Sequence, residues 1–110
     1  MSVFHFEPEP NTIVARLGGR LDAYTAEATK STLVPLVRPA GRLIVDLDGV
    51  EHIATSGIPV LMAVYRKAQE VSGEVVFVCA RPHLRKLFSL TRLDNVFQVV
   101  EHADAVLSPV

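Results

Sequence analysis

Two adjacent hydroxyl residues, Thr55 and Ser56, have the position along the chain that most suggests chemistry. They follow an apolar segment typical of a buried strand, residues 43–47, and they open a segment with the spacing of an amphipathic helix. Backbone N–H groups and the helix dipole favour negative charge at such a position. A hydroxyl there can either accept a phosphate and act as a switch, or simply cap the helix.

Pro59 indicates where this helix begins, because proline is tolerated in the first turn, where its missing N–H is not needed. That places the N-cap at Thr55 or Ser56, and both residue types are favoured N-caps. The local sequence therefore favours capping over phosphorylation as the role of Ser56.

The helix that follows has two faces, since successive residues turn by about 100°. The spacing predicts a core-facing side made of Ile58, Leu61, Met62, Tyr65 and Ala68. It predicts that the opposite, exposed side carries Ser56, Pro59, Val60, Ala63, Lys67 and Glu70. A small apolar strip beside a hydroxyl is a plausible docking surface. The alternative is that these are scattered surface residues with no function.

The remaining elements alternate between strand and helix. Strands are predicted at residues 3–6, 12–17, 42–47, 74–79 and 95–100, and helices at residues 23–37, 56–71 and 83–90, with a final helical turn at residues 101–107. Asp22 and Thr25 are candidate N-caps of the first helix. This alternation predicts one α/β domain over residues 1–110, with a mixed sheet of four or five strands and helices packed mainly on one side.

Composition excludes several classes of protein. Apolar residues make up 49% of the 110 residues, and the formal net charge is -1, so we expect a folded domain that does not bind nucleic acid directly. The N-terminal residues do not resemble a signal peptide, and no apolar run is long enough to span a membrane. Cys79 is the only cysteine. We expect a soluble cytoplasmic protein.

Enzyme chemistry finds little support. Ser56 lacks the Gly-x-Ser-x-Gly pattern of a hydrolase nucleophile, and no glycine-rich phosphate loop is present. The spacing of histidines and of Cys79 indicates no metal site, and no cofactor is expected. The third predicted helix is locally basic, with the cations Arg81, Arg85, Lys86 and Arg92. These side chains form either a solvated face or a contact for an acidic partner.

Motifs along the whole chain resemble the anti-sigma factor antagonists of the STAS domain family. The family pattern Gly-Glu-Leu-Asp corresponds to residues 19–22, Gly-Arg-Leu-Asp, and is followed by Ala-Tyr-Thr-Ala at residues 23–26. The family signature Asp-Ser-Ser-Gly-Leu corresponds to residues 54–58, Ala-Thr-Ser-Gly-Ile. Residues 82–88 and 93–97 are similar to the third helix and final strand of the family.

This resemblance implies a regulatory cycle. The second hydroxyl of the signature, Ser56, would be phosphorylated by an anti-sigma factor with serine kinase activity, and Thr55 is the second-choice acceptor. The unmodified protein would bind that anti-sigma factor and free the sigma factor, the phosphorylated protein would release it, and a phosphatase would reset the cycle. The expected partner-binding residues are Asp22, Thr55, Ser56, Gly57, Pro59, Val60 and Ala63.

Two residues depart from the family pattern. Ala54 replaces the aspartate that precedes the hydroxyl pair, and Arg20 replaces the common glutamate. An aspartate beside the acceptor could orient the hydroxyl or help to bind the metal and nucleotide of a kinase. Its absence favours an alternative in which the chain is a constitutive, unphosphorylated scaffold domain within a larger signalling assembly. Asp22 matches the pattern and either lies near Ser56 or caps the first helix.

Overall fold

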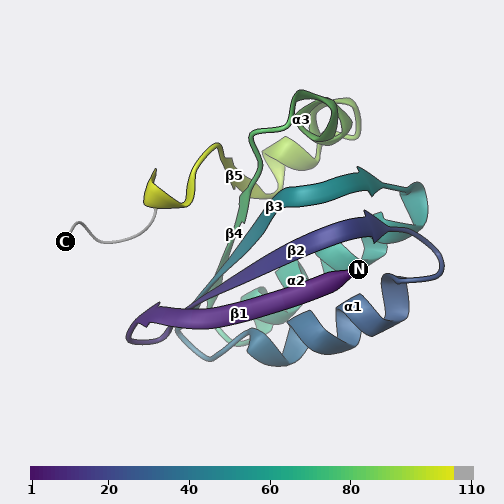
Figure 1. Cartoon of the computed structure of the whole chain (residues 1–110). Helices are drawn as coiled ribbons and strands as arrows, with labels where there is room; N and C mark the ends of the chain where they lie inside the picture. Colours follow the sequence, from purple (N-terminus) through teal and green to yellow (C-terminus); the bar gives the residue numbers. More distant parts are fainter. Residues whose placement is uncertain (106–110) are drawn as a thin grey trace.

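A five-stranded sheet with its three α-helices on one face forms the body of the molecule (Figure 1). The computed structural model describes residues 1–105. The strands are β1 (Ser2–Glu9), β2 (Thr12–Leu21), β3 (Arg42–Ile53), β4 (Glu74–Val78) and β5 (Gln98–Val100). The α-helices are α1 (Ala26–Leu33), α2 (Ile58–Glu70) and α3 (Pro82–Leu90). Short 3₁₀ helices lie at Val34–Leu36, Thr55–Gly57, Leu93–Asn95 and Ala103–Ala105, which are η1 to η4.

The strands lie in the sheet in the order in which they occur along the chain. Strand β1 pairs antiparallel with β2, whereas the pairs β2–β3, β3–β4 and β4–β5 are parallel. Parallel neighbours need crossover connections, and the three α-helices are part of those crossovers. The predicted mixed α/β sheet is therefore confirmed, with five strands.

Alternation along the strands produces one main core. Ile13, Ala15 and Leu17 of β2 face the helices and join the cluster that contains Leu33 of α1, Leu61 of α2 and Leu84 of α3. The intervening Val14 belongs to a smaller cluster on the opposite face, with Ile44 and Val78. Helices thus cover one face of the sheet, as the sequence predicts.

Three strands extend beyond their predicted ends, and the first of them, β1, continues to Glu9 rather than ending at residue 6. β2 continues through Gly18 and Gly19. Its pairing with β3 is irregular on both sides of this glycine pair, between Arg16 and Gly18 and between Gly19 and Arg20. Gly19 has a φ of +99°, which glycine adopts without strain. β3 likewise continues through residues 48–53, beyond its predicted end at residue 47. The paired ends of β2 and β3 therefore project beyond β4.

The helices also differ from prediction at their ends. α1 begins at Ala26 rather than at residue 23, because residues 22–25 form a turn, and Pro35 lies in η1 after α1 has ended. Of the predicted turn at residues 101–107, Ala103–Ala105 is a 3₁₀ helix and residues 106 and 107 lie outside the described part. In residues 1–105, every helix is too short or too polar to cross a bilayer.

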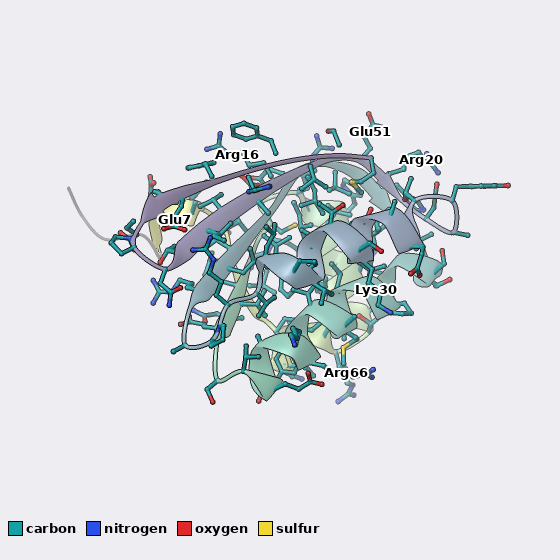
Figure 2. The ribbon with its side chains drawn as sticks, turned by 90° about the horizontal axis from the view of Figure 1, so that it is seen from below. Glu7, Arg16, Arg20, Lys30, Glu51 and Arg66 are labelled. Atoms are coloured by element: carbon teal, nitrogen blue, oxygen red, sulfur yellow. The ribbon has the colours of Figure 1, made fainter. Side chains whose placement is uncertain are left out.

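Charged side chains lie on the surface of the sheet and helices. Seen from below the sheet, Lys30 projects from α1 and Arg66 from α2, away from the core (Figure 2). Arg20 and Glu51 lie at the end of the sheet where β2 and β3 finish, and Glu7 lies at the opposite end (Figure 2). The Thr55–Ser56 pair follows β3 and so belongs to the same end as Arg20.

Candidate functional site

The segment that carries Ser56 is anchored by backbone contacts to the end of β2. The Ala54 N–H donates to the Leu21 carbonyl at 2.8 Å, and the Gly57 N–H donates to the Ala54 carbonyl at 2.8 Å. Thr55–Gly57 form the single 3₁₀ turn η2, and α2 follows directly. The hydroxyl pair is therefore held in a tight turn between two regular elements.

Gly57 fits this turn because the backbone of β2 comes very close. A Cβ at Gly57 would lie 2.7 Å from Leu21 Cγ and 2.9 Å from the Leu21 carbonyl oxygen. Gly57 is buried, unlike its neighbours Thr55 and Ser56 in the expected partner-binding set. Its role in the structure is to let η2 pack directly on Leu21.

Ser56 and Thr55 are both exposed, which confirms that the hydroxyl pair is presented to solvent. The capping interpretation of Ser56 is wrong. Gly57 is the N-cap of α2 and Ala54 that of η2, and neither helix start has a side-chain cap hydrogen bond. Within residues 1–105 the Ser56 hydroxyl forms no hydrogen bond, and its side chain is exposed to solvent. Pro59 occupies the first turn of α2, as expected.

The predicted apolar strip along α2 is only partly present. Pro59 is exposed and Ala63 is half-buried, whereas Val60 is 3% exposed. The expectation that Val60 is exposed is therefore wrong. Helix α2 packs against α1 as well as the sheet, so its buried side is rotated relative to the predicted one and consists of Val60, Leu61, Val64 and Ala68. Ile58, Met62 and Tyr65, predicted to face the core, are half-buried.

Asp22 lies beside this turn because its neighbour Leu21 accepts the hydrogen bond from Ala54. Asp22 Oδ1 accepts hydrogen bonds from the N–H groups of Tyr24 at 3.0 Å and Thr25 at 3.2 Å. The Thr25 hydroxyl accepts from the Asp22 N–H at 3.0 Å and donates to the Arg20 carbonyl at 2.8 Å. The N-cap of α1 is Thr25, without a side-chain cap bond, so Asp22 stabilises the preceding turn and does not cap the helix itself.

Tyr24 is a surface feature that sequence reasoning missed. Its side chain is 96% exposed in the turn that Asp22 holds. The sequence pattern placed Tyr24 inside a helix, where one side would be covered. The Asp22-x-x-Thr25 spacing was the available signal, because both residue types bond to nearby backbone N–H groups and favour a turn.

Charge at this end of the sheet is mixed. Arg20 Nε lies 3.8 Å from Asp22 Oδ2, and 60% of the Arg20 side chain is exposed. Ala54 leaves the position before Thr55 without a carboxylate. No group of three or more potential metal-ligating side chains occurs in residues 1–105. The arrangement therefore offers an exposed hydroxyl on a turn that is hydrogen-bonded to β2, which suits modification or recognition by another protein.

Cys79 lies at the end of β4 and is buried. Burial raises the pKa of the Cys79 thiol above its ordinary value of 9.0, and the nearby Asp48 carboxylate adds to this effect. A thiol with a raised pKa has little thiolate at neutral pH, so Cys79 acts as a small core residue.

The fold and sequence match known proteins over nearly the full chain. BtrV of Bordetella bronchiseptica, which is named as an anti-sigma factor antagonist, is 27% identical over 94 residues, covering 84% of this chain and 81% of BtrV. The crystal structure of an anti-sigma factor antagonist from Mycobacterium paratuberculosis superposes with a TM-score of 0.80 at 27% identity, covering 94% of this chain and 90% of that one.

Two further findings complete the comparison. The phosphorylated form of the Bacillus cell fate determinant SpoIIAA has the same fold, with a TM-score of 0.70 at 19% identity over 96% of both chains. The model of the STAS domain matches residues 5–105. The chain therefore belongs to the STAS domain family, and BtrV and the Mycobacterium paratuberculosis protein, which it resembles, are described as anti-sigma factor antagonists.

Proposed function

We propose that this protein binds an anti-sigma factor that has serine kinase activity, and that phosphorylation of Ser56 releases it. The observation that carries the proposal is the exposed Ser56 hydroxyl, free of capping bonds, on a turn anchored to Leu21. The protein is the substrate of its partner and performs no catalysis, and it acts in the cytoplasm with the sigma factor system. A phosphatase restores the unmodified form.

The partner-binding surface that we propose surrounds Ser56. It comprises the exposed or half-buried members of the expected set, Asp22, Thr55, Ser56, Pro59 and Ala63, and Tyr24 extends it beyond Asp22. Gly57 and Val60 are buried, so they would hold the exposed residues of this surface in place without contacting the partner. A fully exposed tyrosine is the type of residue that often contributes most to binding energy once a partner covers it.

Phosphate on Ser56 would act locally. It adds roughly 1.5 to 2 negative charges near neutral pH, and it disrupts a close interface through desolvation and like-charge repulsion. The adjacent start of α2 favours that charge, so the fold of the free protein need not change. A loss of about 2.7 kcal/mol in binding free energy lowers affinity about a hundredfold, which is enough for a switch.

A constitutive scaffold is the second candidate. Its support is Ala54, which leaves the hydroxyl pair without the carboxylate that could orient it or help to bind a metal–nucleotide group. In that case the same surface binds a partner, but Ser56 is never modified.

Intact mass after incubation with a kinase-type anti-sigma factor and ATP distinguishes these proposals. The switch predicts a gain of one phosphate that is lost in Ser56→Ala and retained in Ser31→Ala, a control at an exposed serine of α1. A phosphate lost only in Thr55→Ala would move the acceptor to Thr55. Stable binding with no gain in mass would support the scaffold, and absence of binding to every such anti-sigma factor would refute both.

A further inference from the structure

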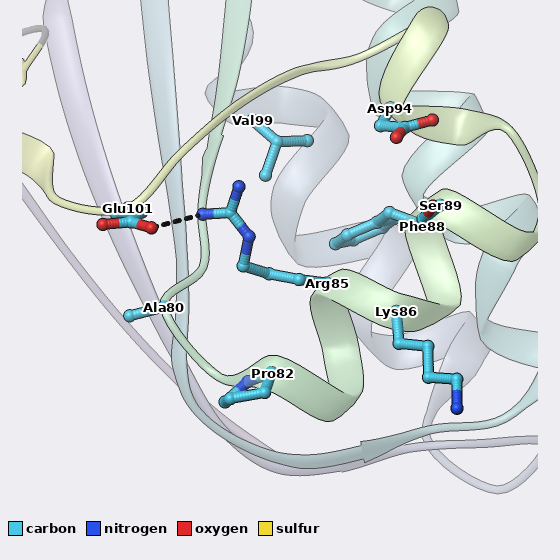
Figure 3. Close-up of a pocket in the computed structure, with 9 residues that line it drawn as sticks. All are labelled: Ala80, Pro82, Arg85, Lys86, Phe88, Ser89, Asp94, Val99 and Glu101. Carbon is cyan, nitrogen blue, oxygen red and sulfur yellow. Dashed lines mark ion pairs between the residues drawn. The ribbon is translucent and has the colours of Figure 1, made fainter.

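A cavity of about 620 Å³ lies between α3 and the carboxyl ends of β4 and β5, and the residues that line it are drawn in Figure 3. Ala80 follows β4 and Glu101 follows β5, and these strands are parallel neighbours. The volume lies within the range of small-molecule sites.

Part of the cavity wall is apolar. Val99 of β5 is half-buried there, and Phe88 of α3, only 1% exposed, lies behind it in the main core. Ala80 and Pro82 form the side nearest β4 (Figure 3). The apolar surface that a ligand can reach is therefore that of Ala80, Pro82 and Val99, and it favours a ligand with a flat or aliphatic body.

Arg85 supplies a charged group at this wall. Its side chain reaches from α3 toward Glu101, with Val99 close to the guanidinium (Figure 3). Nη1 lies 3.2 Å from Glu101 Oε1 and donates to the Cys79 carbonyl at 3.5 Å. Among residues 1–105, Nε and Nη2 have no recorded partner, so the guanidinium keeps donors for an incoming anion.

The ion pair between Arg85 and Glu101 leaves Arg85 accessible to a ligand. The side chains of Arg85 and Glu101 are 41% and 66% exposed. An ion pair this exposed contributes little to stability, so a ligand anion can share or replace Glu101 at small cost. Arginine binds carboxylates and phosphates through two parallel hydrogen bonds, a geometry that a single contact to Glu101 leaves unused.

We propose that this cavity binds a small organic anion, whose carboxylate or phosphate head pairs with Arg85 and whose apolar body packs on Val99 and Pro82. Ser89 and Asp94, which also line the cavity, offer polar contacts to the far end of the ligand. The proposal does not depend on the function of Ser56. It adds a small-molecule site beside the protein-binding surface that we propose around Ser56.

Titration of the full-length, ¹⁵N-labelled protein with benzoate and with phenyl phosphate tests this proposal. Both probes should shift the amide signals of Arg85, Ser89, Val99 and Glu101 in a saturable way, with dissociation constants of about 1 mM for ligands of this size. The stronger of the two identifies the preferred head group. Benzyl alcohol, which lacks the charge, should bind about tenfold more weakly than benzoate.

Two variants assign the head group to Arg85. Arg85→Gln should weaken the tighter probe about tenfold, whereas Glu101→Gln should tighten it because the competing carboxylate is gone. Arg66→Gln, at an exposed cation of α2, is the control and should leave the affinity unchanged. Absence of saturable shifts at the cavity, equal binding of benzyl alcohol, or a Glu101→Gln variant that binds no tighter would overturn the proposal.

Discussion

Gly57→Ala tests how closely the hydroxyl turn depends on contact with β2. The backbone of Gly57, with φ of −83°, is one that alanine adopts freely, so the substitution introduces only the volume of a methyl group. That methyl would lie 2.7 Å from Leu21 Cγ and 2.9 Å from the Leu21 carbonyl oxygen. The carbonyl cannot move without disturbing its hydrogen bond from Ala54.

The expected cost follows from this overlap. Overpacking of this kind typically lowers the free energy of unfolding by about 1–3 kcal/mol. For a domain of this size that corresponds to a fall in Tm of about 4–12 °C. Urea denaturation and thermal melting measure both quantities, and the amide signals of Thr55 and Ser56 should shift because the turn must move away from Leu21.

Gly18→Ala is the matched control. Its added methyl would meet the Ser2 hydroxyl oxygen at 2.9 Å, which is the end of an exposed side chain that can rotate, and no backbone atom closer than 3.8 Å. We expect this variant to stay within about 1 kcal/mol of the unmodified protein. Equal stability of the two variants, or unshifted signals at Thr55 and Ser56 in Gly57→Ala, would refute the reasoning.

Three further substitutions or reactions probe the same account. Val60→Ala should lower the free energy of unfolding in urea by about 2 kcal/mol because Val60 is 3% exposed, and an effect under about 0.5 kcal/mol would mean that it lies on the surface. Asp22→Ala should lower Tm, because it removes the hydrogen bonds from the Tyr24 and Thr25 N–H groups, which are worth about 1 kcal/mol. Asp22→Asn should keep most of that stability, and an equal fall in Tm for the two variants would point to the charge as the cause. Cys79 should react slowly with a thiol reagent at neutral pH until the protein unfolds, and rapid labelling of the folded protein would contradict its burial. Above the ordinary thiol pKa of 9.0 the free energy of unfolding should fall, because the unfolded chain loses the thiol proton at a lower pH than the folded protein does.

The order and type of the elements were predictable from sequence because they depend on local periodicity. Alternation in residues 12–17 and the apolar run in residues 42–47 identify β2 and β3, and their hydrophobic faces decide which side the helices cover. The ends of these strands depend on a partner instead. Gly18 and Gly19 resemble a strand terminus, yet the irregular pairing with β3 lets β2 pass through them.

The site shows the same division. The exposure of Ser56 was predictable from its place before an amphipathic helix. The burial of Val60 was not, because it depends on how α1 packs beside α2. The assignment of Gly57 as N-cap also depended on tertiary structure, since only the close approach of Leu21 explains a glycine there. The cavity beside Arg85 joins residues from α3 and β5 that no sequence pattern connects.

Binding affinity for a kinase-type anti-sigma factor, measured by calorimetry on protein phosphorylated at Ser56 and on unmodified protein, tests the central claim most directly. The account predicts tight binding of the unmodified protein and of Ser56→Ala, and binding at least about a hundredfold weaker after phosphorylation. Equal affinity of the phosphorylated and unmodified forms would contradict it.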